Sequence, residues 1–319
     1  MDLISFADET KTILLNENIE VFGFSRIFNN ISIPESYKEM LPSSLEYLKK
    51  EVWSNLKLYI PWAKSVILVA IPYNTIREKS SIFIGKERVW VSRYAFGEDY
   101  HKVLRNKLKP LKNFLINKNF KAKICVDSFP ILERSHALKA GLGFIGKNGL
   151  LINPHFGSYI FLGEIITNIE MAELNGEQKI LENYCKDCFK CVKACPTKAI
   201  IGDGSINPSK CISSYNVEWK GELPNFAPNF FSNLFGCDIC QEVCPFNNKA
   251  PLTKEKCFYP KEELFAPKLS DLIKKDEKAI AEIIKKTPLE RRGALQIMEN
   301  LKKIFIENQT NRDETEVSL

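Results

Sequence analysis

The chain has 319 residues, of which 45% are apolar, and a formal net charge of +6. This length suffices for two buried cores, and the composition is that of a globular protein rather than a disordered or fibrous one. No apolar run is long enough to span a membrane, and neither a secretory nor a twin-arginine leader pattern stands at the N-terminus. We therefore expect a cytoplasmic protein without a membrane partner.

The first predicted domain, residues 1–178, alternates strand-like and helical stretches. Four apolar runs bounded by Pro, Gly or Asn are typical of strands. They span residues 65–71, 122–126, 150–153 and 159–167. Residues 99–117 and 133–140 carry apolar side chains at helical spacing, and we expect Pro110 to kink or split the first helix. The alternation predicts an α/β or α+β domain, with a sheet flanked by helices.

One glycine motif in this domain invites a nucleotide-binding interpretation, which the order of elements excludes. Gly141-Leu-Gly143-Phe-Ile-Gly146 matches the dinucleotide fingerprint in its letters. That fingerprint must follow a strand and open a helix, whereas here a helix precedes it and a strand follows. We predict instead that Gly141 ends the helix over residues 133–140.

Asp127 stands at the end of a predicted strand, and its neighbours allow two interpretations. It precedes Ser128-Phe129-Pro130, so it is either a helix cap ahead of the proline or a general acid at the edge of the sheet. A general acid would suit a reduction, because a carbon centre that takes up electrons also needs protons. The three histidines, His101, His136 and His155, are expected to be surface or hydrogen-bonding residues.

Eight of the ten cysteines follow the spacing of bacterial ferredoxins. The first run is Cys185-x-x-Cys188-x-x-Cys191-x-x-x-Cys195-Pro196, and the second is Cys237-x-x-Cys240-x-x-x-Cys244-Pro245. The second run lacks its first cysteine, because Leu234 occupies that position, and Cys211 is the natural replacement.

This spacing predicts a ferredoxin-like domain over residues 179–255 that holds two 4Fe–4S clusters. In two-cluster ferredoxins the fourth cysteine of each run ligates the other cluster. The predicted ligands are Cys185, Cys188, Cys191 and Cys244 for one cluster, and Cys195, Cys211, Cys237 and Cys240 for the other. Zinc does not predict the trailing Cys-Pro, and disulfides need an oxidising compartment. Cys125 and Cys257 remain as small buried side chains.

The last predicted part, residues 256–319, is helical. We expect one helix over residues 271–286 with Ser270 as its N-cap, a second over residues 288–307, and a disordered tail of the last dozen residues. Upstream, residues 101–126 contain eight Lys or Arg residues and no acidic ones. That run is either a solvated helix face or a surface for a polyanion.

Several segments together resemble the epoxyqueuosine reductase family, nearly from end to end. The segments are SRYAFGEDYH (92–101), DSFPILER (127–134), AGLGFIGKN (140–148) and GCDICQEVCPF (236–246). The resemblance implies an oxidoreductase that reduces epoxyqueuosine to queuosine in the anticodon loop of tRNA. It further implies a cobalamin between the sheet domain and the cluster domain, charged through the two clusters, with Asp127 as the proton donor.

The same resemblance gives expectations for partners and for further site residues. We expect cobalamin contacts within residues 146–158, among them Lys147, Asn148 and Ser158. The basic run 101–126 would contact tRNA, an external donor would supply electrons, and the protein would be a monomer. Two alternatives stay open at this point: a cobalamin-dependent enzyme of the reductive dehalogenase type, and a non-catalytic 4Fe–4S electron carrier.

Overall fold

A four-stranded antiparallel sheet forms the centre of the N-terminal half. The computed structural model describes residues 3–27, 38–53, 55–83, 87–171 and 182–316. The strand order is β1 (Val21–Arg26), β2 (Ser65–Pro72), β7 (Ile160–Thr167) and β4 (Ala122–Cys125), and every neighbouring pair is antiparallel. The predicted strands at 65–71, 122–126 and 159–167 are therefore confirmed, while β1 at the edge had not been predicted.

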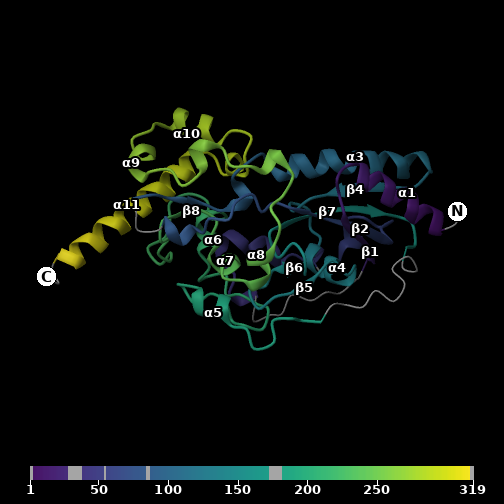
Figure 1. Ribbon diagram of the computed structural model, residues 1–319, viewed down its shortest axis with the longest axis horizontal. Helices are drawn as coiled ribbons and strands as arrows, with labels where there is room; N and C mark the ends of the chain where they lie inside the picture. Colours follow the sequence, from purple (N-terminus) through teal and green to yellow (C-terminus); the bar gives the residue numbers. More distant parts are fainter. Residues whose placement is uncertain (1–2, 28–37, 54, 84–86, 172–181, 317–319) are drawn as a thin grey trace.

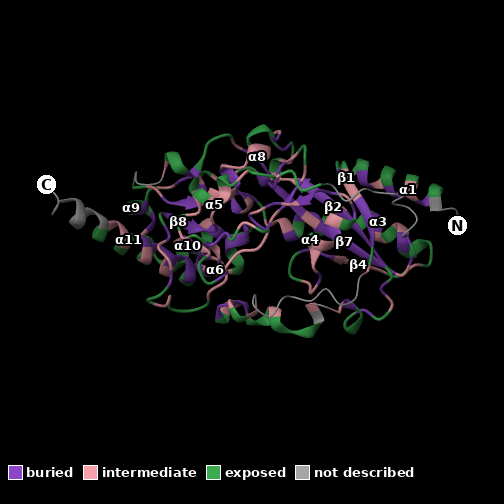
Figure 2. Ribbon diagram, turned by 90° about the horizontal axis from the view of Figure 1, so that it is seen from below, coloured by how far each residue is buried: buried purple, intermediate pink, exposed green. Residues whose placement is uncertain are grey.

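Helices cover both faces of this sheet, as predicted (Figure 1). On one face α1 (Leu3–Asn16) and α3 (Tyr100–Asn117) pack against alternate residues of β2 and β7, such as Val69 and Ile165. On the other face α4 (Glu133–Lys139) packs against Leu68 and Ile166. In Figure 2 buried residues follow the central strands β2 and β7 along nearly their whole length, because helices cover both faces of the sheet there.

Pro110 and Gly23 bear on how the helices of this half lie. Of the two outcomes expected at Pro110, a kink or a split of the helix, the split is wrong, since α3 runs through the proline as one element. The helix tolerates the proline because α3 is held by apolar side chains on both sides of it, including Leu108 and Leu111, which are fully buried. Gly23 in β1 permits a close approach of α4, since a Cβ there would overlap the carbonyl oxygen of Ala140.

The glycine motif after α4 forms a hairpin rather than a nucleotide site. Gly141 has a φ of +73°, and Gly141 and Leu142 donate backbone hydrogen bonds to Leu138 and Ala137, which is the Schellman pattern of a helix end. Strand β5 (Phe144–Ile145) then pairs with β6 (Leu151–Ile152). The rejection of a dinucleotide fingerprint is confirmed by this order, and β6 lies inside the predicted strand at 150–153.

The second half of the chain is built from short elements around the cysteines. These are α5 (Lys190–Ala194), α6 (Ile212–Asn216), β8 (Asn233–Phe235), α7 (Ile239–Glu242) and α8 (Pro245–Lys249). Strand β8 pairs in parallel with β3 (Trp90–Val91) from the N-terminal half. The described residues also form short 3-10 helices: η1 (Ser43–Lys49), η2 (Glu51–Trp53), η3 (Leu56–Leu58), η4 (Ser80–Ile82), η5 (Arg93–Ala95), η7 (Lys256–Phe258), η8 (Glu262–Leu264) and η9 (Pro288–Arg291).

The C-terminal segment is helical, but its boundaries differ from those predicted. It contains α9 (Leu269–Leu272), α10 (Glu277–Ile284) and α11 (Ala294–Glu316). Ser270 is not an N-cap: it lies inside α9, and the side chain of Asp276 caps α10 by accepting a hydrogen bond from the backbone N of Ala279 at 2.8 Å.

The prediction of a disordered tail is also wrong for residues 308–316, which continue α11. Buried Ile297, Leu301 and Ile304 anchor the first half of that helix in a core shared with β3, β8 and α10. An anchored helix can propagate into a polar sequence, because only its nucleation is costly. Residues 317–319 lie outside the described residues. Among the residues that are described, no helix is long and apolar enough to cross a bilayer.

Candidate active site

Asp127 lies where three distant segments meet. It follows β4 with a φ of +52°, a backbone conformation that Asp tolerates better than most residues. Its Oδ2 atom is 3.0 Å from Nε2 of His101, at the start of α3, and 3.6 Å from a guanidinium nitrogen of Arg291, in η9. The Asp127 side chain is 52% exposed. A half-exposed carboxylate is therefore held between a histidine and an arginine.

The capping interpretation of Asp127 finds no support in this geometry. The N-cap residue of α4 is Leu132, whose apolar side chain makes no capping hydrogen bond. The Asp127 carboxylate binds His101 instead. The backbone N–H of Asp127 donates a hydrogen bond of 2.6 Å to Oε1 of Glu133. The backbone contact fixes the loop, and the carboxylate caps no helix.

His101 links two aspartates and is almost completely buried. Its Nδ1 atom is 2.6 Å from Oδ1 of Asp99, the N-cap residue of α3, and its Nε2 atom faces Asp127. Burial opposes the charged imidazole, but the hydrogen bonds to Asp127 and Asp99 outweigh it and raise the pKa of His101. The ring of Tyr100 stacks on His101 with 4.1 Å between centroids. The expectation of a hydrogen-bonding histidine is confirmed for His101.

These contacts decide the ionisation of Asp127. Burial acts to raise its pKa, but the hydrogen bond to His101 and the positive charges of His101 and Arg291 are stronger together. The pKa of Asp127 is therefore lower than usual, and the side chain rests as a carboxylate at neutral pH. If it acts as a general acid, it must first take up a proton.

The cysteines fall into two groups, and each group joins cysteines that are distant in sequence. The pKa of Cys191 is raised by burial and then by the charges of Cys185 and Cys244, and that of Cys244 by burial and then by Cys185 and Cys188. In the second group, burial and then neighbouring thiols raise the pKa of three cysteines: Cys195 acts on Cys211 and Cys237, and Cys237 and Cys211 act on Cys240, which is also affected by Cys191 of the first group. Most of these neighbours fall within the predicted ligand sets, including the crossed Cys195 and Cys244, and the assignment itself remains a prediction.

The chemistry of these thiols fits clusters of iron. Crowded, half-buried thiolates repel one another, and positively charged iron would remove that penalty. Within the described ranges, no group of three or more His, Cys, Asp or Glu side chains is arranged around one point as a single metal ion requires. All ten cysteines are free of disulfides, and Cys125 is fully buried as predicted, whereas Cys257 is half-buried.

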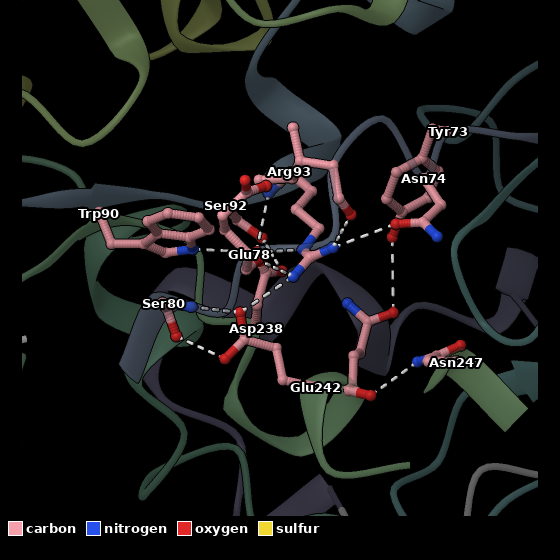
Figure 3. Close-up of polar contacts among 12 residues, drawn as sticks. Tyr73, Asn74, Glu78, Ser80, Trp90, Ser92, Arg93, Asp238, Glu242 and Asn247 are labelled. Carbon is pink, nitrogen blue, oxygen red and sulfur yellow. Dashed lines mark hydrogen bonds and ion pairs between the residues drawn. The ribbon is translucent and has the colours of Figure 1, made fainter. Parts of the chain in front are cut away.

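A buried polar network joins the cluster-bearing loop to the N-terminal half (Figure 3). Asp238, between Cys237 and Cys240, accepts hydrogen bonds from Nε1 of Trp90 at 3.0 Å, from the backbone N of Arg93 at 2.9 Å, and from the Ser92 hydroxyl. The Arg93 guanidinium lies 3.3 Å from Glu242 and is 4% exposed.

Glu242 in turn accepts two bonds of 2.6 Å, from the backbone N and the hydroxyl of Ser80. The network therefore fixes the positions of Cys237 and Cys240 relative to the sheet domain.

Lys147 and Ser158, two of the predicted cofactor contacts, lie at the junction of the two halves. The Lys147 ammonium lies over the ring of Phe189, 3.4 Å from its centroid. The Ser158 hydroxyl donates to Oε1 of Gln241 at 2.9 Å. Asn148, the third, is buried in the hairpin loop. Their role toward a cofactor stays a prediction.

Sequence reasoning missed several residues of this site. His101 had not been placed beside Asp127, and neither Arg291 nor the partners of Asp238 had been singled out. The segment SRYAFGEDYH carried a signal, since it supplies Ser92, Arg93 and His101. Arg291 had no such signal, because it reaches the site only through the packing of the C-terminal segment.

Comparison with known proteins identifies the family. The family model described as "Epoxyqueuosine reductase QueG, DUF1730" matches residues 54–128, and the one described as "4Fe-4S double cluster binding domain" matches residues 184–247. An epoxyqueuosine reductase of Lactococcus garvieae is 33% identical over 87% of this chain and 80% of its own length. The chain belongs to the epoxyqueuosine reductase family. It is accordingly an oxidoreductase with a double 4Fe–4S domain.

Other members of the family agree in sequence and in structure. The epoxyqueuosine reductase of Escherichia coli is 38% identical over 66% of this chain, but the match spans only 56% of that longer protein. A crystal structure of epoxyqueuosine reductase with an epoxyqueuosine-modified tRNA stem loop has a TM-score of 0.82 and 28% identity, and covers 96% of this chain and 82% of its own. A Bacillus subtilis epoxyqueuosine reductase, with its catalytic loop swung out of the active site, has a TM-score of 0.80 and 29% identity, with the same coverage. The predicted fold class is confirmed by these matches.

Proposed function

We propose that this family member reduces epoxyqueuosine to queuosine in tRNA, with Asp127 as the proton donor. The observation that carries the proposal is the convergence of Asp127 with His101 and Arg291. Burial and then the charge of Asp127 raise the pKa of Glu218, a residue of the cluster-bearing half. These contacts support a role for Asp127 as proton donor, because they bring α3 and the C-terminal segment to one half-exposed carboxylate.

The overall reaction sets what the site must supply. Converting an epoxide to an alkene breaks both C–O bonds, forms a C=C bond and consumes two electrons and two protons, and the oxygen leaves as water. When bound, the two clusters and a cobalamin would supply the electrons. The two protons come from solvent by way of protein groups, and we propose that the half-exposed Asp127 carboxyl group delivers one of them.

The surroundings of the site fit a cobalamin. Two guanidinium nitrogens of Arg292, Nε and Nη2, and the hydroxyl of Tyr159 are buried without a hydrogen-bond partner within the described part of the chain. Cobalamin carries amide and phosphate oxygens that accept such bonds. We propose Lys147, Asn148 and Ser158 as further contacts, because Lys147 and Ser158 lie at the junction of the two halves and Asn148 lies in the adjoining hairpin loop.

The family and the exposed basic residues of α3 both support a tRNA substrate. The solved relative named above holds a modified tRNA stem loop. In this chain Lys102, Arg105 and Lys109 are exposed on α3, the helix that begins next to Asp127. Contacts from these residues to phosphates would be independent of sequence and sensitive to salt. Other basic residues of the run have partners, such as Lys107, which binds Glu255 at 2.7 Å.

The remaining expectations complete the proposal. We propose a monomer that works in the cytoplasm, where tRNA is modified, and that takes electrons from an external donor. We further propose that residues 1–178 bind cobalamin, residues 179–255 hold the clusters and residues 256–319 close the site. Arg291 supports the last of these roles, because it brings the C-terminal segment to Asp127.

The substitution Asp127→Asn tests the proton donor. With reconstituted clusters and added cobalamin, we expect iron and corrinoid binding to persist while conversion of epoxyqueuosine-bearing tRNA slows by roughly 100-fold or more. Conversion is measured by nucleoside analysis of the tRNA. Asp271→Asn, an exposed aspartate in α9, is the matched control and should convert at the normal rate. Normal conversion by the Asp127 variant would remove this residue from the mechanism.

A further inference from the structure

Glu164 is a carboxylic acid in the centre of the four-stranded sheet. In β7 it lies opposite Leu68 of β2 and Cys125 of β4, and it is completely buried. Neither of its carboxyl oxygens accepts a hydrogen bond from an N–H or hydroxyl group among the described residues, and its side chain meets the carboxyl group of Glu133 instead. An ionised carboxylate without partners is costly to bury, so this side chain is held as a neutral acid.

Glu164 lies behind the Asp127 loop, on the face of the sheet that α4 covers. Its cross-strand neighbours Leu68 and Cys125 belong to the core that also contains Ala137 and Ala140 of α4 and its C-cap. Cys125 is two residues before Asp127, so the buried acid lies directly beneath the loop.

Glu133 lies between the buried acid and Asp127. It is the first residue of α4, and its Oε1 atom accepts the backbone N–H of Asp127 at 2.6 Å. Three carboxyl groups, from β7, from α4 and from the loop after β4, therefore follow one another from the protein interior toward solvent.

The electrostatics of the two inner acids favour their protonated forms. Burial and then the charge of Asp127 raise the pKa of Glu133 to about 8, against the Asp127 N–H bond and the charges of Arg134 and His101. Burial and then Glu133 and Asp127 raise the pKa of Glu164 well above its usual value. Among the described residues, Tyr100 of α3 also lies in the field of Asp127 and Glu133, and Lys123 of β4 and Arg105 of α3 act on Cys125.

Epoxide reduction requires two protons, and Asp127 rests without one. We propose that Glu133 and Glu164 form a proton store that reloads Asp127. In this scheme a proton leaves the Glu133 carboxyl for the Asp127 carboxylate, and a proton from Glu164 restores Glu133. Solvent refills the store between turnovers, so protons balance and no further oxidant or reductant takes part. The scheme rests on the proposed function, since it serves the same aspartate.

Infrared spectroscopy tests the store without substrate or cofactor. In D₂O at neutral pH the intact protein should show C=O absorption of protonated carboxyl groups, with one component lost in Glu164→Gln and another in Glu133→Gln. Glutamine keeps the shape of the side chain and its neutrality but cannot pass a proton. Glu282→Gln, an exposed glutamate in α10, should leave the absorption unchanged. Absence of any such component from the wild-type protein would overturn the proposal.

Turnover at different pH values provides the second measurement. Wild-type conversion should fall as pH rises through about 8, where Glu133 loses its proton. Glu133→Gln should be slower, by roughly tenfold at pH 7, and should lack this fall, and Glu164→Gln should be slowed similarly. Normal rates and pH profiles in both variants would overturn the store, whereas a wild-type protein that converts no epoxyqueuosine would overturn the proposed function and leave the infrared result standing.

Discussion

Two groups of buried carboxyl side chains in this protein are treated in opposite ways. Next to the cysteines, Asp238 receives three hydrogen bonds, and Glu242 is paired with Arg93 and Ser80. Behind Asp127, no N–H or hydroxyl group donates to Glu164 within the described ranges, and its side chain meets another carboxyl group, that of Glu133. A buried carboxylate whose hydrogen bonds are all made holds its neighbours in place, whereas a buried carboxyl group without donors keeps its proton. The comparison assigns rigidity to the electron-transfer side and proton chemistry to the sheet side.

The largest expected effect on stability comes from substituting Asp238, in the hydrogen-bonded network beside the cysteines. In the wild-type protein Oδ2 of Asp238 accepts hydrogen bonds from both Trp90 and Arg93. In Asp238→Asn an amide NH₂ can take the place of Oδ2, and because it cannot accept, these buried donors lose their acceptor. Breaking such a buried charged contact costs roughly 3–5 kcal/mol. We expect a lower Tm and poorer iron retention in the reconstituted protein, measured by thermal melting and iron analysis. Asp203→Asn, an exposed aspartate, should change neither. Equal behaviour of both variants would mean that the network does not stabilise the cluster-bearing loop.

The matching substitution behind Asp127, Glu164→Gln, should change the Tm only mildly, and the change should depend on pH. The raised pKa values of Glu164 and Glu133 mean that the folded state binds more protons than the unfolded state above about pH 4.5. Stability of the wild-type protein therefore falls as pH rises from there through the folded pKa values. Glu164→Gln removes part of this dependence, so its Tm relative to wild type should rise between pH 5 and pH 8. A loss of stability that is the same at every pH would indicate a purely structural glutamate.

The smallest expected effect concerns the link between Asp127 and α3. Because the pKa of His101 is raised in the folded state, its stabilising contribution is full below its unfolded pKa and is lost as pH rises through its folded pKa. His101→Gln should cost about 1 kcal/mol at pH 6, since half-exposed Asp127 is screened by solvent, and less at pH 9. Thermal melts at the two pH values measure the difference. A larger cost at pH 9 would contradict this ionisation scheme.

The sequence predicted what depends on local pattern. Cysteine spacing placed the double-cluster domain, apolar runs placed β2, β4 and β7, and the order of elements excluded a nucleotide site at Gly141. It failed where tertiary packing decides the outcome. Asp276 rather than Ser270 caps a helix, α11 continues through a polar sequence, and Arg291 reaches Asp127 from 164 positions away. Glu164 lay unnoticed in an apolar strand, because only the register of β7 shows that it is buried beneath the Asp127 loop.

The most direct measurement of the central claim is conversion of tRNA-bound epoxyqueuosine by the intact chain under reducing, anaerobic conditions, with and without cobalamin. With about eight irons per molecule reconstituted, the account predicts that queuosine forms only when cobalamin is present. Formation of queuosine without cobalamin, or none in its presence while the clusters are intact, would contradict it.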